Sequence, residues 1–188
     1  MLLFSLAGFL SLYALMRFKA VTDIAVGPDF AEGWLMLMGL LSLAVAAAFL
    51  LAQRNYKRML AYSSVEHMGI LILGIGIGGL ATFGALLHLL TNGLTKGVLF
   101  LSAGNIHRAY GSKLTDDVRG AMRRLPVSGP LFLAGFLVVT GSPPGGPFIS
   151  EFIIFRAGFA AHSIAYAVTG IALLALVFAG MLGNVNQM

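Results

Sequence analysis

Hydrophobic residues fill six long segments of the chain, and the shorter stretches between them collect charged residues, glycine and proline. A helix needs about 20 apolar residues to cross a bilayer, and all of the segments but the fifth approximate that length. We therefore predict an all-α fold, a polytopic transmembrane helix bundle with about six spans that forms a single domain over residues 1–188. The segments cover about residues 1–18, 33–53, 59–80, 81–104, 127–160 and 163–185.

The fifth segment is interrupted by three prolines and three glycines. Its apolar run stops after Thr140, passes through Gly141-Ser142-Pro143-Pro144-Gly145-Gly146-Pro147, and resumes at Phe148. Proline cannot continue a regular helix, because it lacks a backbone N–H and clashes with the preceding turn. Either an ordinary loop joins two short helices here, or one discontinuous helix crosses the membrane. We favour the discontinuous helix, because each half is too short to span and unpaired backbone at membrane depth survives only inside protein or beside water.

The composition supports an integral membrane protein. Hydrophobic residues make up 59% of the chain, charged residues 10%, and the mean hydropathy is +0.92. Soluble domains carry about 25% charged residues, so this chain cannot cover a water-facing surface with polar groups. The absence of cysteine excludes disulfides, iron–sulfur ligation and thiolate zinc sites on this chain. The four histidines are scattered and not paired at metal-ligand spacing, so we predict neither a metal site nor a cofactor.

The net charge of +5 lies mainly in two connecting stretches. Residues 54–58 and 105–126 together hold eight lysines and arginines, against three on the opposite side of the predicted bundle. Short loops rich in lysine and arginine stay in the cytoplasm. We therefore predict that loops 54–58 and 105–126 are cytoplasmic, which explains the charge better than a nucleic-acid patch does.

The fourth segment carries His88, Asn92 and Lys96 at positions i, i+4 and i+8. On a helix these side chains form one slanting stripe roughly 12 Å long. A lysine at the centre of a spanning helix costs about 2.5–3.5 kcal/mol, and an ionisable residue there indicates an ion or proton path. Alternatively, Lys96 pairs with a carboxylate to fix helix packing. Discontinuous helices are where transporters tend to form ion sites, and Glu151 lies one turn beyond the break.

A second candidate group lies in the third segment. Glu66 either neutralises Lys57 or Arg58, or accepts a proton that enters from the cytoplasm. His67 is adjacent, but neighbouring residues of a helix face about 100° apart, so the two cannot act as one ligand set. The chain has no nucleophile–base constellation, and we predict no redox or catalytic centre on it.

Residues Asn55 to Gly69 read N-Y-K-R-M-L-A-Y-S-S-V-E-H-M-G. This motif resembles the signature of the antiporter-like subunits of respiratory complex I, Mrp-type Na⁺/H⁺ antiporters and group 4 hydrogenases. Residues 88–105 resemble the eleventh helix of that family, and residues 141–155 its broken twelfth helix. Residues 117–120 and 122–126 are most similar to the hydrogenase-4 component F type. The resemblance covers essentially the whole chain and implies a fragment with helices 8–13 of about 14.

The resemblance implies a proton-translocating membrane subunit of a hydrogenase-4 or complex I-like, redox-driven ion pump in a prokaryotic inner (plasma) membrane. Its partners would be other membrane subunits and the soluble redox subunits of an oxidoreductase complex. Lys96 matches the proton-carrying lysine of the eleventh helix, His88 a histidine of the connecting axis, and Glu151 the exit residue of the twelfth helix. The alternatives are a subunit of an Mrp-type Na⁺/H⁺ antiporter and a non-conducting membrane anchor.

Two positions depart from the family pattern. Asn92 stands where many relatives have histidine, so a proton passing this position would need bound water. Phe9 falls where several relatives have lysine or histidine in the eighth helix, and its ring carries no proton.

Overall fold

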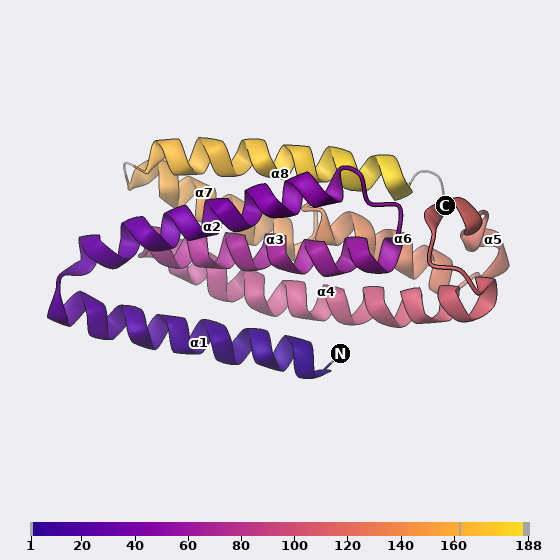
Figure 1. The fold of residues 1–188 in the computed structure, drawn as a ribbon, viewed down its shortest axis with the longest axis horizontal. Helices are drawn as coiled ribbons and strands as arrows, with labels where there is room; N and C mark the ends of the chain where they lie inside the picture. Colours follow the sequence, from indigo (N-terminus) through magenta and orange to yellow (C-terminus); the bar gives the residue numbers. More distant parts are fainter. Residues whose placement is uncertain (1, 162, 186–188) are drawn as a thin grey trace.

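The computed structural model describes residues 2–161 and 163–185, and regular secondary structure in these ranges is helical (Figure 1). This confirms the predicted all-α class. A short 3₁₀ turn, Thr115–Asp117, accompanies eight α-helices. The α-helices are α1 (Leu2–Ala25), α2 (Pro28–Leu50), α3 (Tyr56–Ile77), α4 (Leu80–Tyr110), α5 (Ala121–Arg124), α6 (Ser128–Val139), α7 (Gly146–Ala160) and α8 (Ile164–Val185).

Four of the helices in the described ranges, α2, α3, α4 and α8, are long and apolar enough to cross a membrane. Large apolar side chains on their outer faces are exposed, as in Leu90, Leu94 and Leu101 of α4. Without a lipid environment such a surface would be unfavourable in water. The chain is therefore a multi-pass membrane protein, as the hydrophobic pattern predicts.

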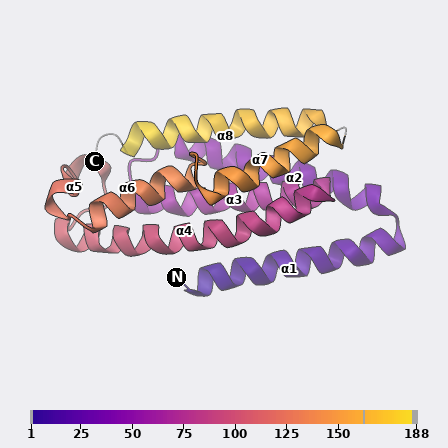
Figure 2. The same ribbon diagram turned by 180° about the vertical axis from the view of Figure 1, so that it is seen from behind.

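The fifth predicted segment forms two helices that follow one another along the bundle, joined by the link 140–145 (Figure 2). The predicted discontinuous helix is confirmed. The break is shorter than the run of glycine and proline, because Gly146 and Pro147 already belong to the first turn of α7. Proline is tolerated there, since the first N–H groups of a helix have no intrahelical partner.

The helix α4 continues beyond the apolar segment 81–104 and ends at Tyr110, before Gly111 in the left-handed conformation. The predicted loop 105–126 is therefore partly helical, at its start and again in α5. Its middle binds the other predicted loop: Thr115 N–H donates to the Arg54 carbonyl at 3.0 Å, and Tyr56 Oη donates to the Ser112 carbonyl at 3.2 Å. The two basic loops thus lie at the same end of the bundle.

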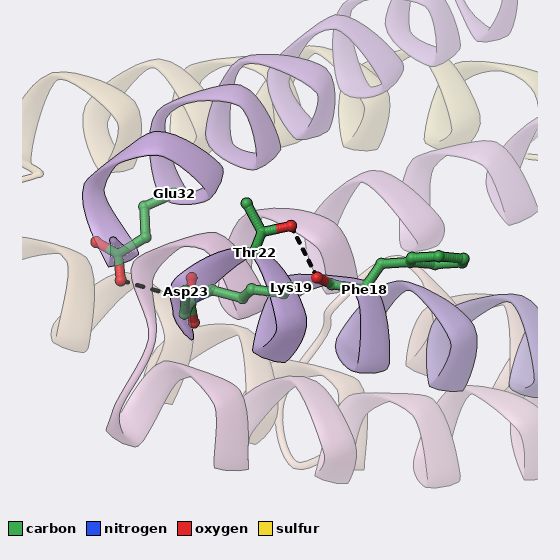
Figure 3. Close-up of polar contacts among 5 residues, drawn as sticks. All are labelled: Phe18, Lys19, Thr22, Asp23 and Glu32. Carbon is green, nitrogen blue, oxygen red and sulfur yellow. Dashed lines mark hydrogen bonds and ion pairs between the residues drawn. The ribbon is translucent and has the colours of Figure 1, made fainter. Parts of the chain in front are cut away.

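The helix α1 lies at one edge of the bundle and α8 at the opposite edge (Figures 1 and 2). Lys19 connects α1 to α2: its ammonium lies 2.7 Å from Asp23 Oδ2 in the next turn of α1 and 3.6 Å from Glu32 Oε1 of α2 (Figure 3). Thr22 is tied to its own helix, donating to the Phe18 carbonyl at 2.8 Å.

The apolar core consists of two clusters at different heights in the bundle. On α3 the buried members of the first cluster reach Leu60, and those of the second begin at Ile70. On α4, which runs the other way, the second cluster ends at Ala85 and the first begins at Leu99. The link between α6 and α7 falls in the same interval. The fold therefore leaves a layer between two apolar cores, and polar side chains fill it.

Candidate functional site

We call this set of side chains the polar layer. It comprises Ser63, Glu66 and His67 of α3, His88, Asn92 and Lys96 of α4, and Ser150 and Glu151 of α7. The predicted stripe on α4 faces into the layer: His88 is 0% exposed, and Asn92 and Lys96 are each 9% exposed. The spacing of four residues keeps these side chains on one face of the helix.

Lys96 is held by neutral oxygens of α3. Its Nζ donates to the Leu60 carbonyl at 3.0 Å and to Ser63 Oγ. Ser63 Oγ donates its own proton to the same carbonyl at 3.0 Å, so it has lone pairs free to accept from Lys96. Within the described residues no carboxylate lies within 4.0 Å of the Lys96 ammonium. Lys96 therefore does not form the direct ion pair with a carboxylate that the sequence analysis gave as the alternative.

His67, His88 and Ser150 form a hydrogen-bonded row from α3 through α4 to α7. His67 Nδ1 lies 3.0 Å from His88 Nε2, and His88 Nδ1 lies 2.8 Å from Ser150 Oγ. Ser150 donates its hydroxyl proton to the Pro147 carbonyl at 2.8 Å, so it accepts from His88 Nδ1–H. With both rings neutral, His88 Nε2 is then the acceptor and His67 Nδ1–H the donor.

Glu151 lies beside this row, at the break. One ligand atom each of His67, His88 and Glu151 lies within 4.8 Å of the other two. The Glu151 carboxylate also packs on the link itself, because a Cβ added to Gly141 would stand 2.7 Å from Glu151 Oε2. Gly141 has φ +74°, which glycine adopts without strain. The link thus provides both the turn and the space that place Glu151 in the layer.

Two buried oxygens of the layer, Glu66 Oε2 and Asn92 Oδ1, have no hydrogen-bond partner among the residues the structure describes. Glu66 is 3% exposed and interacts electrostatically with Lys96 and with Glu151. The Glu66 carboxylate thus acts on both the lysine and the glutamate that the sequence predicts as path residues. Asn92 offers an amide one turn from each of its stripe neighbours.

Lys57 lies outside the polar layer, in the first turn of α3, where its N–H donates to the capping Asn55 side chain. It is nine residues from Glu66, a rise of about 13 Å along the helix. In the described part of the chain, Glu66 forms no ion pair with Lys57 or Arg58. Of the two alternatives for Glu66, the ion pair with Lys57 or Arg58 is therefore not formed.

The sequence analysis missed Ser63 and Ser150. Both donate to carbonyls of their own helices, which is ordinary for serine in membrane helices and gives no signal by itself. Ser63 belongs to the A-Y-S-S run of the quoted motif, and Ser150 directly precedes Glu151. Nearness to those features is the only signal in the sequence that could have found them. The histidines, scattered along the sequence, include two whose rings meet.

A family of transmembrane proteins described as "NADH:quinone oxidoreductase/Mrp antiporter, TM" matches residues 1–177. The chain belongs to this antiporter family. A member from Methylacidiphilum infernorum, a hydrogenase-4 component F homolog, is 37% identical over 165 residues, 87% of this chain and 35% of that protein. NADH-quinone oxidoreductase subunit N of Desulforudis audaxviator is 37% identical over 149 residues, 77% of this chain and 29% of that protein.

Two solved structures contain a chain with the same fold. A chain of the Mrp complex from Dietzia sp. superimposes with a TM-score of 0.84 at 22% identity, over 92% of this chain and 32% of that one. A chain of the archaeal membrane-bound sulfane sulfur reductase gives a TM-score of 0.86 at 22% identity, over 94% and 37%. The present chain spans about a third of the length of the relatives it matches.

Proposed function

We propose that the chain is a proton-conducting part of an antiporter-family membrane subunit, in which protons pass between Lys96 and Glu151 through the polar layer. The observation that carries this proposal is the contact of 3.0 Å between His67 Nδ1 and His88 Nε2. It joins α3 to α4, and His88 of α4 lies beside Glu151 of α7. Lys96, two turns along α4 from His88, binds the Leu60 carbonyl of α3. Imidazole accepts a proton on one nitrogen and releases one from the other, so a pair of rings in contact can relay protons.

The path begins at the end of the bundle that carries loops 54–58 and 105–126, which we propose faces the cytoplasm of a prokaryotic cell. Lys96 accepts the proton, and the charge of Glu66 favours its arrival. From Lys96 the proton reaches the two histidines through water held by Asn92. Glu151, beside the broken helix, receives it on the exit side.

The two apolar clusters supply the barrier that a pump requires. Leu60 and Leu99 lie between the polar layer and the basic end of the bundle, and Ile70 and Ala85 lie on its other side. A proton therefore does not pass freely between the polar layer and either end of the bundle. Moving one charge across 100 mV requires about 2.3 kcal/mol, which a change in charge pairing inside a protein can supply.

The relatives suggest what drives this step. They include a hydrogenase-4 component F homolog and a subunit of NADH-quinone oxidoreductase, so we propose other membrane subunits and soluble redox subunits as partners. The likeness to a chain of an Mrp complex keeps a Na⁺/H⁺ antiporter subunit as the second candidate. Imidazole nitrogens in the polar layer favour protons over Na⁺, which prefers oxygen ligands. The third candidate function is a membrane anchor that conducts no protons.

The test uses Lys96→Ala and Glu151→Ala in the assembled complex, with proton uptake into vesicles as the readout. We expect both variants to assemble and to lose uptake, because each removes a group that binds the moving proton. Lys113→Ala, in the basic loop, is the control and should keep uptake. Undiminished uptake in both path variants would refute conduction and support the anchor. A sodium-dependent pH change in vesicles without an electron donor would support the antiporter instead.

A further inference from the structure

We propose that His67, His88 and Glu151 form a binding site for a divalent transition-metal cation of the Zn²⁺ class. The site combines residues of three helices, α3, α4 and α7, that are far apart in the sequence. Their ligand atoms lie within 4.8 Å of one another, and the two histidines are fully buried. From the sequence we predicted no metal site, because the histidines are not at metal-ligand spacing along the chain. The fold brings two of them together in space.

The two imidazoles already stand close to the separation that a metal imposes. Zn²⁺ binds histidine nitrogen at about 2.0–2.1 Å in tetrahedral geometry, which places two such nitrogens about 3.3 Å apart. His67 Nδ1 and His88 Nε2 are 3.0 Å apart, so the two nitrogens need to separate only slightly, and each ring must turn until its lone pair points at the cation. Glu151, which is partly exposed, is the ligand that has to move further.

His88 also has an acceptor at its other nitrogen. Histidines that bind metals usually donate that second N–H to an oxygen, which fixes the ring orientation. His88 Nδ1 bonds to Ser150 Oγ at 2.8 Å. The backbone carbonyl of Val139 lies close to the His67 ring, although Nε2 has no partner with hydrogen-bond geometry in the described residues. Metal binding at Nδ1 would place the proton of His67 on Nε2.

The donor set and the charge of the surroundings select the class of cation. Two imidazole nitrogens and one carboxylate suit Zn²⁺, Ni²⁺ or Co²⁺, whereas Na⁺, Mg²⁺ and Ca²⁺ prefer oxygen. The polar layer contains two carboxylates, Glu66 and Glu151, and one ammonium, Lys96. Metal binding releases protons from its ligands, so Glu151 would bind the cation as a carboxylate.

Occupancy of this site would interrupt the histidine pair. The cation takes the lone pairs of His67 Nδ1 and His88 Nε2, which a proton needs in order to pass between the rings. This consequence rests on the proposed proton path, but the binding itself does not. A bound Zn²⁺ would therefore inhibit proton uptake.

The experiment measures Zn²⁺ bound to the purified full chain in detergent by equilibrium dialysis. We expect one tight Zn²⁺ per chain, lost in His88→Gln and weakened in Ser150→Ala by about 10- to 100-fold, because Ser150 orients His88. His107→Gln is the matched control: it lies on the same helix, bonded to the Ser112 carbonyl outside the polar layer, and should bind as the wild type does. Co²⁺ replacement should give the visible absorption of a low-symmetry nitrogen and oxygen site.

Equal Zn²⁺ binding by wild type, His88→Gln and Ser150→Ala would overturn the proposal, as would a wild type without stoichiometric binding. Ser150→Ala removes only a hydroxyl, so it decides the matter even if His88→Gln fails to fold. A parallel measurement of proton uptake with Zn²⁺ or Mg²⁺ separates the two proposals. Stoichiometric binding without inhibition would refute the path through the histidines while leaving the metal site in place.

Discussion

Two lysines of this chain occupy contrasting environments. The ammonium of Lys19, at the edge of the bundle, lies 2.7 Å from Asp23 and 3.6 Å from Glu32 (Figure 3). That of Lys96, between the two apolar cores, binds a carbonyl and a hydroxyl of α3 and has no carboxylate at ion-pair distance in the described chain. Two carboxylates hold the ammonium of Lys19 in place. Lys96 is bound by neutral oxygens only, and we propose that this arrangement suits it to proton transfer.

Between the two end residues of the path, Lys96 and Glu151, the largest effect is expected at His88. His88→Gln keeps a polar side chain but cannot accept and release a proton, so we expect proton uptake to fall by roughly 100-fold, as for loss of an acid–base group. Vesicles containing the assembled complex provide the measurement. His107→Gln, on the same helix, should retain uptake. Wild-type uptake in His88→Gln would remove the histidine row from the path.

A somewhat smaller effect is expected at the link between α6 and α7. Gly141→Ala places a methyl group 2.7 Å from the present position of Glu151 Oε2, so it should displace the carboxylate and lower proton uptake by roughly tenfold. Gly27→Ala is the matched control, because Gly27 also has positive φ but no atom within 4 Å of an added Cβ. Both variants bear the backbone strain, and only the first moves a path residue. Equal uptake in both would show that the position of Glu151 is unimportant.

The support of Lys96 by α3 can be tested within one motif. Ser63→Ala removes a hydrogen bond to the ammonium, and we expect uptake to change by about fivefold, equivalent to about 1 kcal/mol. Ser64→Ala is the control, since Ser64 donates to the same Leu60 carbonyl at 3.2 Å but forms no hydrogen bond with Lys96. If Ser64→Ala changes uptake as much as Ser63→Ala does, the effect comes from the helix backbone.

The smallest effect on transport is expected at the other lysine. Lys19→Gln breaks both contacts of the ion cluster, and partly exposed pairs contribute about 1 kcal/mol or less to stability. We expect a slightly lower melting temperature of the purified chain and unchanged proton uptake. A loss of uptake comparable with that of the Lys96 variants would erase the contrast between the two lysines.

The sequence predicted those parts of the fold and site that depend on one helix at a time. Positions i, i+4 and i+8 placed His88, Asn92 and Lys96 on one face, and the proline–glycine run located the break. Helix ends were less accurate, because hydropathy marks where a helix leaves lipid. The predicted fourth segment ends at residue 104, whereas α4 runs on to Tyr110, where the left-handed Gly111 ends it.

Contacts between helices were not predictable from the residue pattern. The contact between His67 and His88 depends on the register of α3 against α4. That register is set by how the two helices pack, and no local sequence pattern indicates it. The roles of Ser63 and Ser150 depend on the same register. An ion pair of Glu66 with Lys57 or Arg58 was one alternative from the sequence, but it is not formed. A rise of about 13 Å along α3 separates Lys57 from Glu66.

The most direct test of the account is proton uptake by vesicles that contain the complex with Lys96→Arg. Arginine keeps the positive charge but does not release its proton in proteins. Lys19→Arg is the matched control at the paired lysine. We predict that both variants assemble, that Lys19→Arg transports normally, and that Lys96→Arg takes up no protons. Normal uptake in Lys96→Arg would contradict the claim that Lys96 carries the proton.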